Sequence, residues 1–252
     1  MTTLRSAVFN VWMVLLTFGM AAWGNLLRLI APDMVYGVAR CWARMVVGSA
    51  RVMCGITVKV TGLDTLPATG PMVLASQHQS AFDTAIWLAV GRDVSYVVKA
   101  ELGRVPLFGA LLRPAHQVLV NRSAGATALR HMVADAADRV RAGRTIVIFP
   151  QGTRTQSGVQ VPIQPGIAAL AARLRLPIFP VATDSGRLWG RRAFRKEPGC
   201  IHITIGAPLP PDLPRAVLVQ RLQQSWDALL PPVDNSVHKS ETVLFRNGTA
   251  EP

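Results

Sequence analysis

The chain has 252 residues, enough for one substantial domain with short terminal segments but not for two full domains. Half of the residues are hydrophobic and 16% are charged, a balance that leans toward membrane contact. The net charge of +13 favours anionic partners, but without zinc-ligand spacing or a ribonucleoprotein motif we expect no nucleic acid among them.

Residues 7–27 carry no charge over a length that can just cross a bilayer as a helix, and no cleavage site for a signal peptide follows. Residues 33–55 are predicted to form a second helix, with arginines on one face, which suits the membrane interface. The pair forms either one spanning segment with an interfacial helix or a hairpin in one leaflet. Basic residues place the rest of the chain on the cytoplasmic side: Arg28, Arg40, Arg44 and Arg51.

Short β-rich runs alternate with helical patterns beyond residue 55. The predicted strands span 56–62, 72–76, 94–100, 118–120, 145–150, 178–183 and 201–206. The predicted helices span 80–90, 123–142, with Ser123 as N-cap, 166–175 and 214–230. This order indicates an α/β fold with a mixed, largely parallel central sheet flanked by helices. We therefore expect membrane-anchoring helices over 1–55, one catalytic domain over 56–232 and a flexible tail over 233–252.

The first polar segment of interest is SQHQSAFD, in which Asp83 follows His78 by five positions where a buried strand gives way to a helix. A neutral imidazole can accept the proton of an attacking hydroxyl, and a carboxylate on its other nitrogen fixes the tautomer and stabilises the imidazolium. The same residues also suit an ordinary helix start, with Ser80 as the cap and Asp83 at the helix dipole. The residue types alone leave both interpretations open.

A second polar segment, PQGTRT at 150–155, follows the buried strand TIVIF. Ligands bind at the carboxyl ends of strands in open α/β sheets. Gly152 permits close backbone approach, Thr153 offers a hydroxyl and an amide, and Arg154 can hold phosphate through two parallel hydrogen bonds. The alternative is an ordinary turn with a solvated arginine.

Together these segments resemble two motifs of the glycerolipid acyltransferase family, which includes 1-acylglycerol-3-phosphate acyltransferases. The first motif is similar to HQSAFD at 78–83 and the third to FPQGTR at 149–154. VLVNR at 118–122 resembles the second motif, and PIFPV at 177–181 resembles the fourth. Order and spacing agree over residues 56–230, so the resemblance covers most of the chain.

The resemblance implies that His78 takes the proton of the acceptor hydroxyl while Asp83 orients its imidazole. The hydroxyl oxygen then attacks the thioester carbonyl directly, without an acyl-enzyme. The residues expected to bind the lysophospholipid acceptor are Arg122, Gln151, Gly152, Thr153 and Arg154. The implied co-substrate is acyl-CoA or an acyl-carrier-protein thioester, and the family needs no metal and no further cofactor.

Two positions depart from the family pattern. Gln151 stands where the third motif usually has Glu, and His116 stands where a glycine commonly opens the second motif. The leading hypothesis is acylation of the sn-2 hydroxyl of lysophosphatidic acid to form phosphatidic acid, at the cytoplasmic side of a bacterial inner membrane. The departures keep open another lysolipid acceptor, such as lyso-ornithine lipid. A non-catalytic membrane protein that binds anionic lipid is the alternative of another class.

The segment 185–196, SGRLWGRRAFRK, mixes basic with aromatic residues. Such a mixture suits an anionic membrane interface or an acidic acyl carrier protein. A solvated basic loop is the plain alternative.

Overall fold

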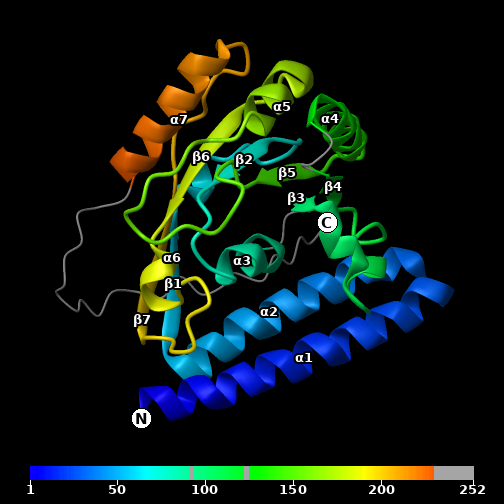
Figure 1. The fold of residues 1–252 in the computed structure, drawn as a ribbon, viewed down its shortest axis with the longest axis vertical. Coiled ribbons are helices and arrows are strands. Elements are labelled where there is room, and N and C mark those ends of the chain that lie inside the picture. Colours follow the sequence, from blue (N-terminus) through cyan, green and yellow to red (C-terminus); the bar gives the residue numbers. More distant parts are fainter. Residues whose placement is uncertain (91–92, 122–124, 230–252) are drawn as a thin grey trace.

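The computed structural model describes residues 1–90, 93–121 and 125–229. A seven-stranded sheet with the order β1-β7-β6-β2-β5-β3-β4 forms its centre (Figure 1). The strands are β1 Ile56–Thr61, β2 Val73–Ser76, β3 Val94–Lys99, β4 Val118–Val120, β5 Thr145–Ile148, β6 Ile178–Thr183 and β7 Gly199–Ile205. All neighbouring pairs are parallel except β6 with β7. The mixed, largely parallel sheet and all seven predicted strands are confirmed.

Helices cover both faces of this sheet. The helices predicted after β1 are confirmed as α3 Phe82–Val90, α4 Gly125–Arg141, α5 Gly166–Leu174 and α7 Arg215–Leu229. Helix α6, Ser185–Leu188, was not predicted, because a single turn has no apolar repeat to detect. The predicted N-cap Ser123 and the tail 233–252 lie outside the described residues.

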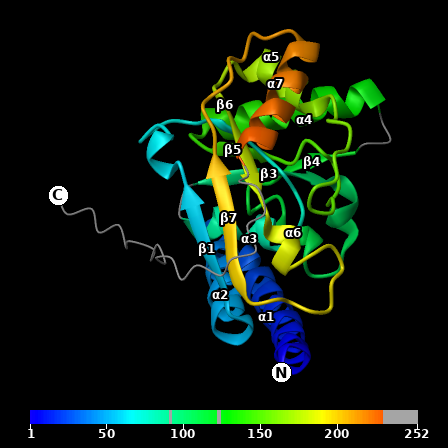
Figure 2. The same cartoon turned by 90° about the vertical axis from the view of Figure 1, so that its left-hand side faces the viewer.

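The central strand β2 shows why both faces need cover. Leu74 packs in one hydrophobic cluster with α1, α2 and α3, whereas Val73 and Ala75 pack in a second cluster with α4, α5 and α7. Successive side chains of a strand point to opposite faces, so the continuous apolar run of β2 requires a helical layer on each side. Figure 2 views the molecule from the edge at which β1 and β7 pair.

The N-terminal part of this helical layer is a helical hairpin. Helices α1, Thr2–Ile30, and α2, Val35–Cys54, are joined by the 3-10 turn Pro32–Met34 and pack against each other along their length (Figure 1). Helix α1 is long and apolar enough to cross a membrane, with a mean hydropathy of 1.6 in its most apolar window. Its exposed face is largely apolar and includes Leu4, Val11, Leu15, Phe18, Trp23 and Leu29.

Polar contacts fix α1 beside the α/β domain near both of its ends. The Asn10 side-chain amide donates to the carbonyl of Phe194 at 3.0 Å, and that of Asn25 donates to the carbonyl of Leu107 at 2.6 Å. Helix α2 packs in turn on α3. The hairpin therefore belongs to the same packed body as the sheet rather than extending away from it.

Candidate active site

The polar segments singled out in the sequence meet at one edge of the sheet. His78 follows β2, and Gly152–Arg154 follow β5 directly beside it. Lys99 ends β3, the next strand along. Because these three strands are parallel, their carboxyl ends carry the side chains to a common edge, as expected for this class of sheet.

The His78 imidazole and the Asp83 carboxylate are in direct contact, with 3.1 Å between Nδ1 and Oδ2. The same oxygen accepts the backbone N–H groups of Gln79 at 2.7 Å and Ser80 at 2.8 Å. Asp83 is buried, so these donors hold a carboxylate that is shielded from water. The Ser80 hydroxyl accepts the backbone N–H of Phe82, the first residue of α3, at 3.1 Å, while the Asp83 carboxylate holds the turn before α3 and orients the imidazole. The structure thus combines both interpretations of the segment.

The His78 ring is also fixed by its aromatic neighbour. It stacks on Phe149 with ring centroids 4.1 Å apart and an angle of 18° between the planes. Since Asp83 occupies Nδ1, Nε2 is the ring nitrogen left to exchange a proton with a substrate. A proton acceptor held in one orientation and one tautomer meets the geometric requirement for a general base.

Ser185, which the sequence patterns did not single out, supports Asp83 from the opposite side. Its hydroxyl donates to Asp83 Oδ1 at 2.6 Å, and the serine is fully buried at the start of α6. The available signal was its position, because Ser185 follows the end of β6 by two residues. Asp83 Oδ2 therefore has two backbone donors besides the imidazole, and Asp83 Oδ1 has the Ser185 hydroxyl as its donor.

We expect Ser185→Ala to lower kcat by about tenfold, the loss of one hydrogen bond to a charged group, and to leave the KM of both substrates nearly unchanged. The physical reason is that Asp83 would lose its Oδ1 donor and would hold the imidazole less firmly. Steady-state kinetics of the alanine and threonine variants check this, since Ser185→Thr keeps the hydroxyl and should recover most of kcat. Equal losses in both variants would indicate a packing role.

Gln151 joins the two motifs through its side-chain amide. Its Oε1 accepts the backbone N–H of His78 at 2.6 Å, and its Nε2 donates to the Thr155 hydroxyl at 3.2 Å. The Thr155 N–H in turn donates to the His78 carbonyl at 2.8 Å. An amide serves this bridge well, because it accepts on one side and donates on the other, so the substitution of the usual Glu is structurally accommodated here.

A cavity of about 570 Å³ opens in front of His78. Gly152, Thr153 and Arg154 line it, and Gly152 has a φ of 74°, in the left-handed region that glycine adopts without strain. The apolar part of the lining is shared by the sheet, α3, the segment after β3 and the N-terminal hairpin; it includes Met20, Val38, Trp42, Leu88, Tyr96 and Leu112. The same cavity thus holds the His78 imidazole and a large apolar surface.

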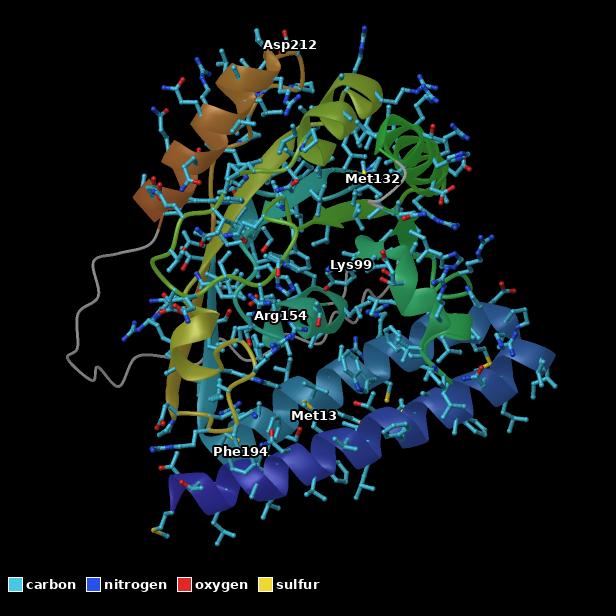
Figure 3. All side chains as sticks on the ribbon, viewed as in Figure 1. Met13, Lys99, Met132, Arg154, Phe194 and Asp212 are labelled. Carbon is cyan, nitrogen blue, oxygen red and sulfur yellow. The ribbon has the colours of Figure 1, made fainter. Side chains whose placement is uncertain are left out.

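The charged side chains that line this cavity are all basic: Lys99, Arg154, Arg191 and Arg192. No acidic residue lines it in the described part of the chain. Burial lowers the pKa of the Arg154 guanidinium; the Asp83 carboxylate opposes this, and the positive charge of Arg191 lowers the pKa further. Arginine side chains keep their charge in proteins at neutral pH, so Arg154 is a cation in this cavity. Figure 3 shows Arg154 between the sheet and the hairpin.

Two residues of the sequence motifs remain to be considered, Arg122 and His116. Arg122 falls outside the described residues, so its predicted contact with the acceptor stays a prediction. His116 has a φ of 60° and packs near the Tyr36 ring at 6.0 Å between centroids. That left-handed conformation explains why a glycine suits this position in the family motif.

Comparisons with known proteins agree with this geometry. Residues 57–184 match the sequence profile of the family described as Acyltransferase. The chain is 32% identical over 214 residues to a 1-acyl-sn-glycerol-3-phosphate acyltransferase of Pseudomonas aeruginosa, and the match covers 82% of each chain. The chain belongs to the acyltransferase family.

A further relative and a solved structure are also similar to this chain. A Bacillus subtilis 1-acyl-sn-glycerol-3-phosphate acyltransferase is 31% identical over 156 residues, covering 60% of this chain and 73% of its own. The crystal structure of the 1-acyl-sn-glycerophosphate (LPA) acyltransferase PlsC from Thermotoga maritima has the same fold, with a TM-score of 0.68 at 19% identity over 90% of this chain and 95% of that one. In this acyltransferase, the described residues hold no group of three or more His, Cys, Asp or Glu side chains placed to bind a metal ion.

Proposed function

We propose that this acyltransferase moves a fatty acyl group from a thioester to the sn-2 hydroxyl of lysophosphatidic acid, forming phosphatidic acid. The observation that carries the proposal is the cavity, whose lining combines a carboxylate-held imidazole, basic side chains and many apolar side chains. A single-tailed phospholipid has the matching parts: a hydroxyl, a phosphate and an acyl chain. The names of the relatives from Pseudomonas and Bacillus support this choice of substrate.

The reaction follows from the arrangement of His78 and Asp83. Nε2 of His78 takes the proton of the acceptor hydroxyl as the hydroxyl oxygen bonds to the thioester carbonyl carbon. Asp83 stabilises the imidazolium that forms. The carbon–sulfur bond then breaks, and the imidazolium returns its proton to the departing thiolate. The transfer is direct, so the protein supplies a base and a positioning site rather than a nucleophile.

We expect Arg154→Ala to raise the acceptor KM by about tenfold to a hundredfold, the range for a lost hydrogen bond between charged groups. The guanidinium lines the cavity next to the Gly152–Thr153 backbone, where it can hold the phosphate of lysophosphatidic acid while the hydroxyl faces His78. Kinetics at varied acceptor concentration check this. An unchanged acceptor KM with an undiminished rate would argue against a phosphate contact at this residue.

The choice of acceptor is tested by incubating the purified protein with labelled acyl thioester and a panel of lysolipids. Lysophosphatidic acid should gain the label fastest, and lyso-ornithine lipid, which lacks a phosphate for Arg154, should gain little. Preferred labelling of lyso-ornithine lipid would reject the proposed substrate but keep the reaction. The same assay run with acyl-CoA and with acyl-carrier-protein thioesters identifies the donor.

We further propose that the hairpin lies in one leaflet with the catalytic domain of residues 56–232 on the cytoplasmic face of a bacterial inner membrane. Polar contacts hold α1 alongside the domain near both ends, which suits a helix lying along the membrane better than one crossing it. The exposed apolar face of α1 would be immersed in lipid, and the arginines of α2 would meet the headgroups. An N-terminal epitope tag should then be accessible from the same side of sealed vesicles as the domain. A tag accessible only from the other side would show that α1 spans.

A further inference from the structure

The segment that follows α6, Trp189–Lys196, is held rigidly against the hairpin. The Trp189 ring is buried and packs edge-on against Phe9 of α1 at 5.2 Å between centroids. Lys196 is also buried, and its ammonium donates to the carbonyls of Ala193 and Phe194 and to the Asn10 side chain of α1. Figure 3 shows Phe194 beside α1. Both ends of the segment are therefore fixed, which limits where the side chains between them can reach.

The arginines of this region differ in their partners. Arg187 forms an ion pair with Asp184 at 3.3 Å, and Arg195 forms one with Glu197 at 3.0 Å. Arg191 and Arg192 have no carboxylate partner in the described part of the chain, and both line the cavity. The two arginines without an acid are thus the two that face the substrate space.

Arg191 is tied directly to the loop that carries Arg154. Its Nη1 donates to the Arg154 backbone carbonyl at 3.3 Å, so the two residues enter the cavity from adjoining walls. The carboxylate of Asp83 is engaged by His78, two backbone N–H groups and Ser185, and it does not line the cavity. The positive charge of Arg191 still lowers the pKa of Arg154 although Asp83 acts in the opposite direction, and an anionic ligand between the two cations would remove their repulsion.

The chemistry of this pair selects a particular kind of anion. A guanidinium offers a planar fork of donors that matches phosphate oxygens. A phosphate monoester carries a charge of about −1.5 to −2 at neutral pH, which two guanidinium groups can balance. A phosphodiester with a choline or ethanolamine group carries one negative charge and a compensating positive one. A paired site should therefore favour the monoester.

We propose that Arg191 binds the phosphate monoester of the acceptor together with Arg154 and makes the enzyme selective for that headgroup. The assignment rests on the proposed function, because it concerns the acceptor of the same reaction. It gives the basic segment after α6 a role in substrate recognition, in which one of its arginines reaches the ligand from outside the sequence motifs.

The test compares the KM values of Arg191→Ala and Arg195→Ala in micelles of an uncharged detergent. Arg195 is the matched control, because it lies in the same segment, carries the same charge and is likewise exposed, but it is paired with Glu197 and does not line the cavity. Arg191→Ala should raise the KM for lysophosphatidic acid by about tenfold, the lower end for a lost charged hydrogen bond, with the thioester KM unchanged. Arg195→Ala should stay near wild type, and Arg191→Lys, which keeps the charge without the fork, should fall between.

Three results would overturn the assignment. A higher KM for the thioester instead of the acceptor would place the donor's phosphates at Arg191. An equal rise of the acceptor KM in the Arg191 and Arg195 variants would show that the effect comes from the general surface charge. An unchanged acceptor KM in Arg191→Ala, while the wild type acylates lysophosphatidic acid, would refute this residue's role and leave the proposed function standing. Failure of the wild-type enzyme to acylate lysophosphatidic acid would reject both.

Discussion

His78→Ala is expected to lower kcat by about a hundredfold to ten-thousandfold, the contribution typical of general base catalysis. Without the imidazole, the described lining of the cavity holds no other histidine and no carboxylate to take the proton of the acceptor hydroxyl, and a neutral alcohol attacks a thioester slowly. Alanine also removes the ring that stacks on Phe149, so folding is checked by circular dichroism and membrane association by sedimentation with vesicles. Acyl transfer is measured with labelled thioester under saturating acceptor.

The chain offers a matched control for this variant in His202. Its Nδ1 lies 3.0 Å from Asp184 Oδ2, so it forms a second imidazole–carboxylate pair, but it does not line the cavity. His202→Ala removes a comparable contact and should keep turnover near the wild-type value. Near-normal turnover in His78→Ala, or an equal loss in both variants, would reject His78 as the base.

Asp83→Asn is the second large effect, with an expected fall in kcat of about a hundredfold or more, as for carboxylate-to-amide changes in comparable triads. The backbone N–H groups of Gln79 and Ser80 would orient the amide oxygen toward His78, and the amide nitrogen would face the Ser185 hydroxyl. The geometry can therefore persist while the negative charge that stabilises the imidazolium is lost. The KM values of both substrates should change little.

This variant also separates the two functions that meet in Asp83. Thermal unfolding measured beside kcat reports how far Asp83 stabilises the turn before α3, because an amide oxygen can still accept the two backbone N–H groups. If Tm falls while turnover remains, the carboxylate serves only to hold that turn. If turnover falls while Tm is nearly kept, the carboxylate acts through His78, and Asp184→Asn provides the control with an intact cavity.

The sequence predicted the sheet and the core of the site because both depend on local patterns. Each of the seven strands is a short apolar run between breakers, and His78 and Asp83 meet across a single strand-to-helix turn. Their contact therefore needs no long-range information. The loop at Gly152–Arg154 was placed correctly because the carboxyl ends of parallel strands share one edge.

The features that the sequence did not indicate depend on contacts between distant segments. Ser185 reaches Asp83 across 102 positions, and Arg191 reaches Arg154 across 37. Neither belongs to a repeating pattern. The sequence also did not indicate that α1 packs beside the domain. An uncharged run of about twenty residues has the same composition whether it crosses a bilayer or packs along a protein.

The N-terminal hairpin forms part of the wall of the cavity that holds His78. Met20, Val38 and Trp42 come from the hairpin, so under the proposed function the helices that would anchor the protein also line the space for the acyl chain of the substrate. A shortened chain without its first 55 residues would not be a soluble version of the enzyme, because its chamber would lie open along one side. In the proposed arrangement, the same two helices bind to lipid and complete the wall of the cavity.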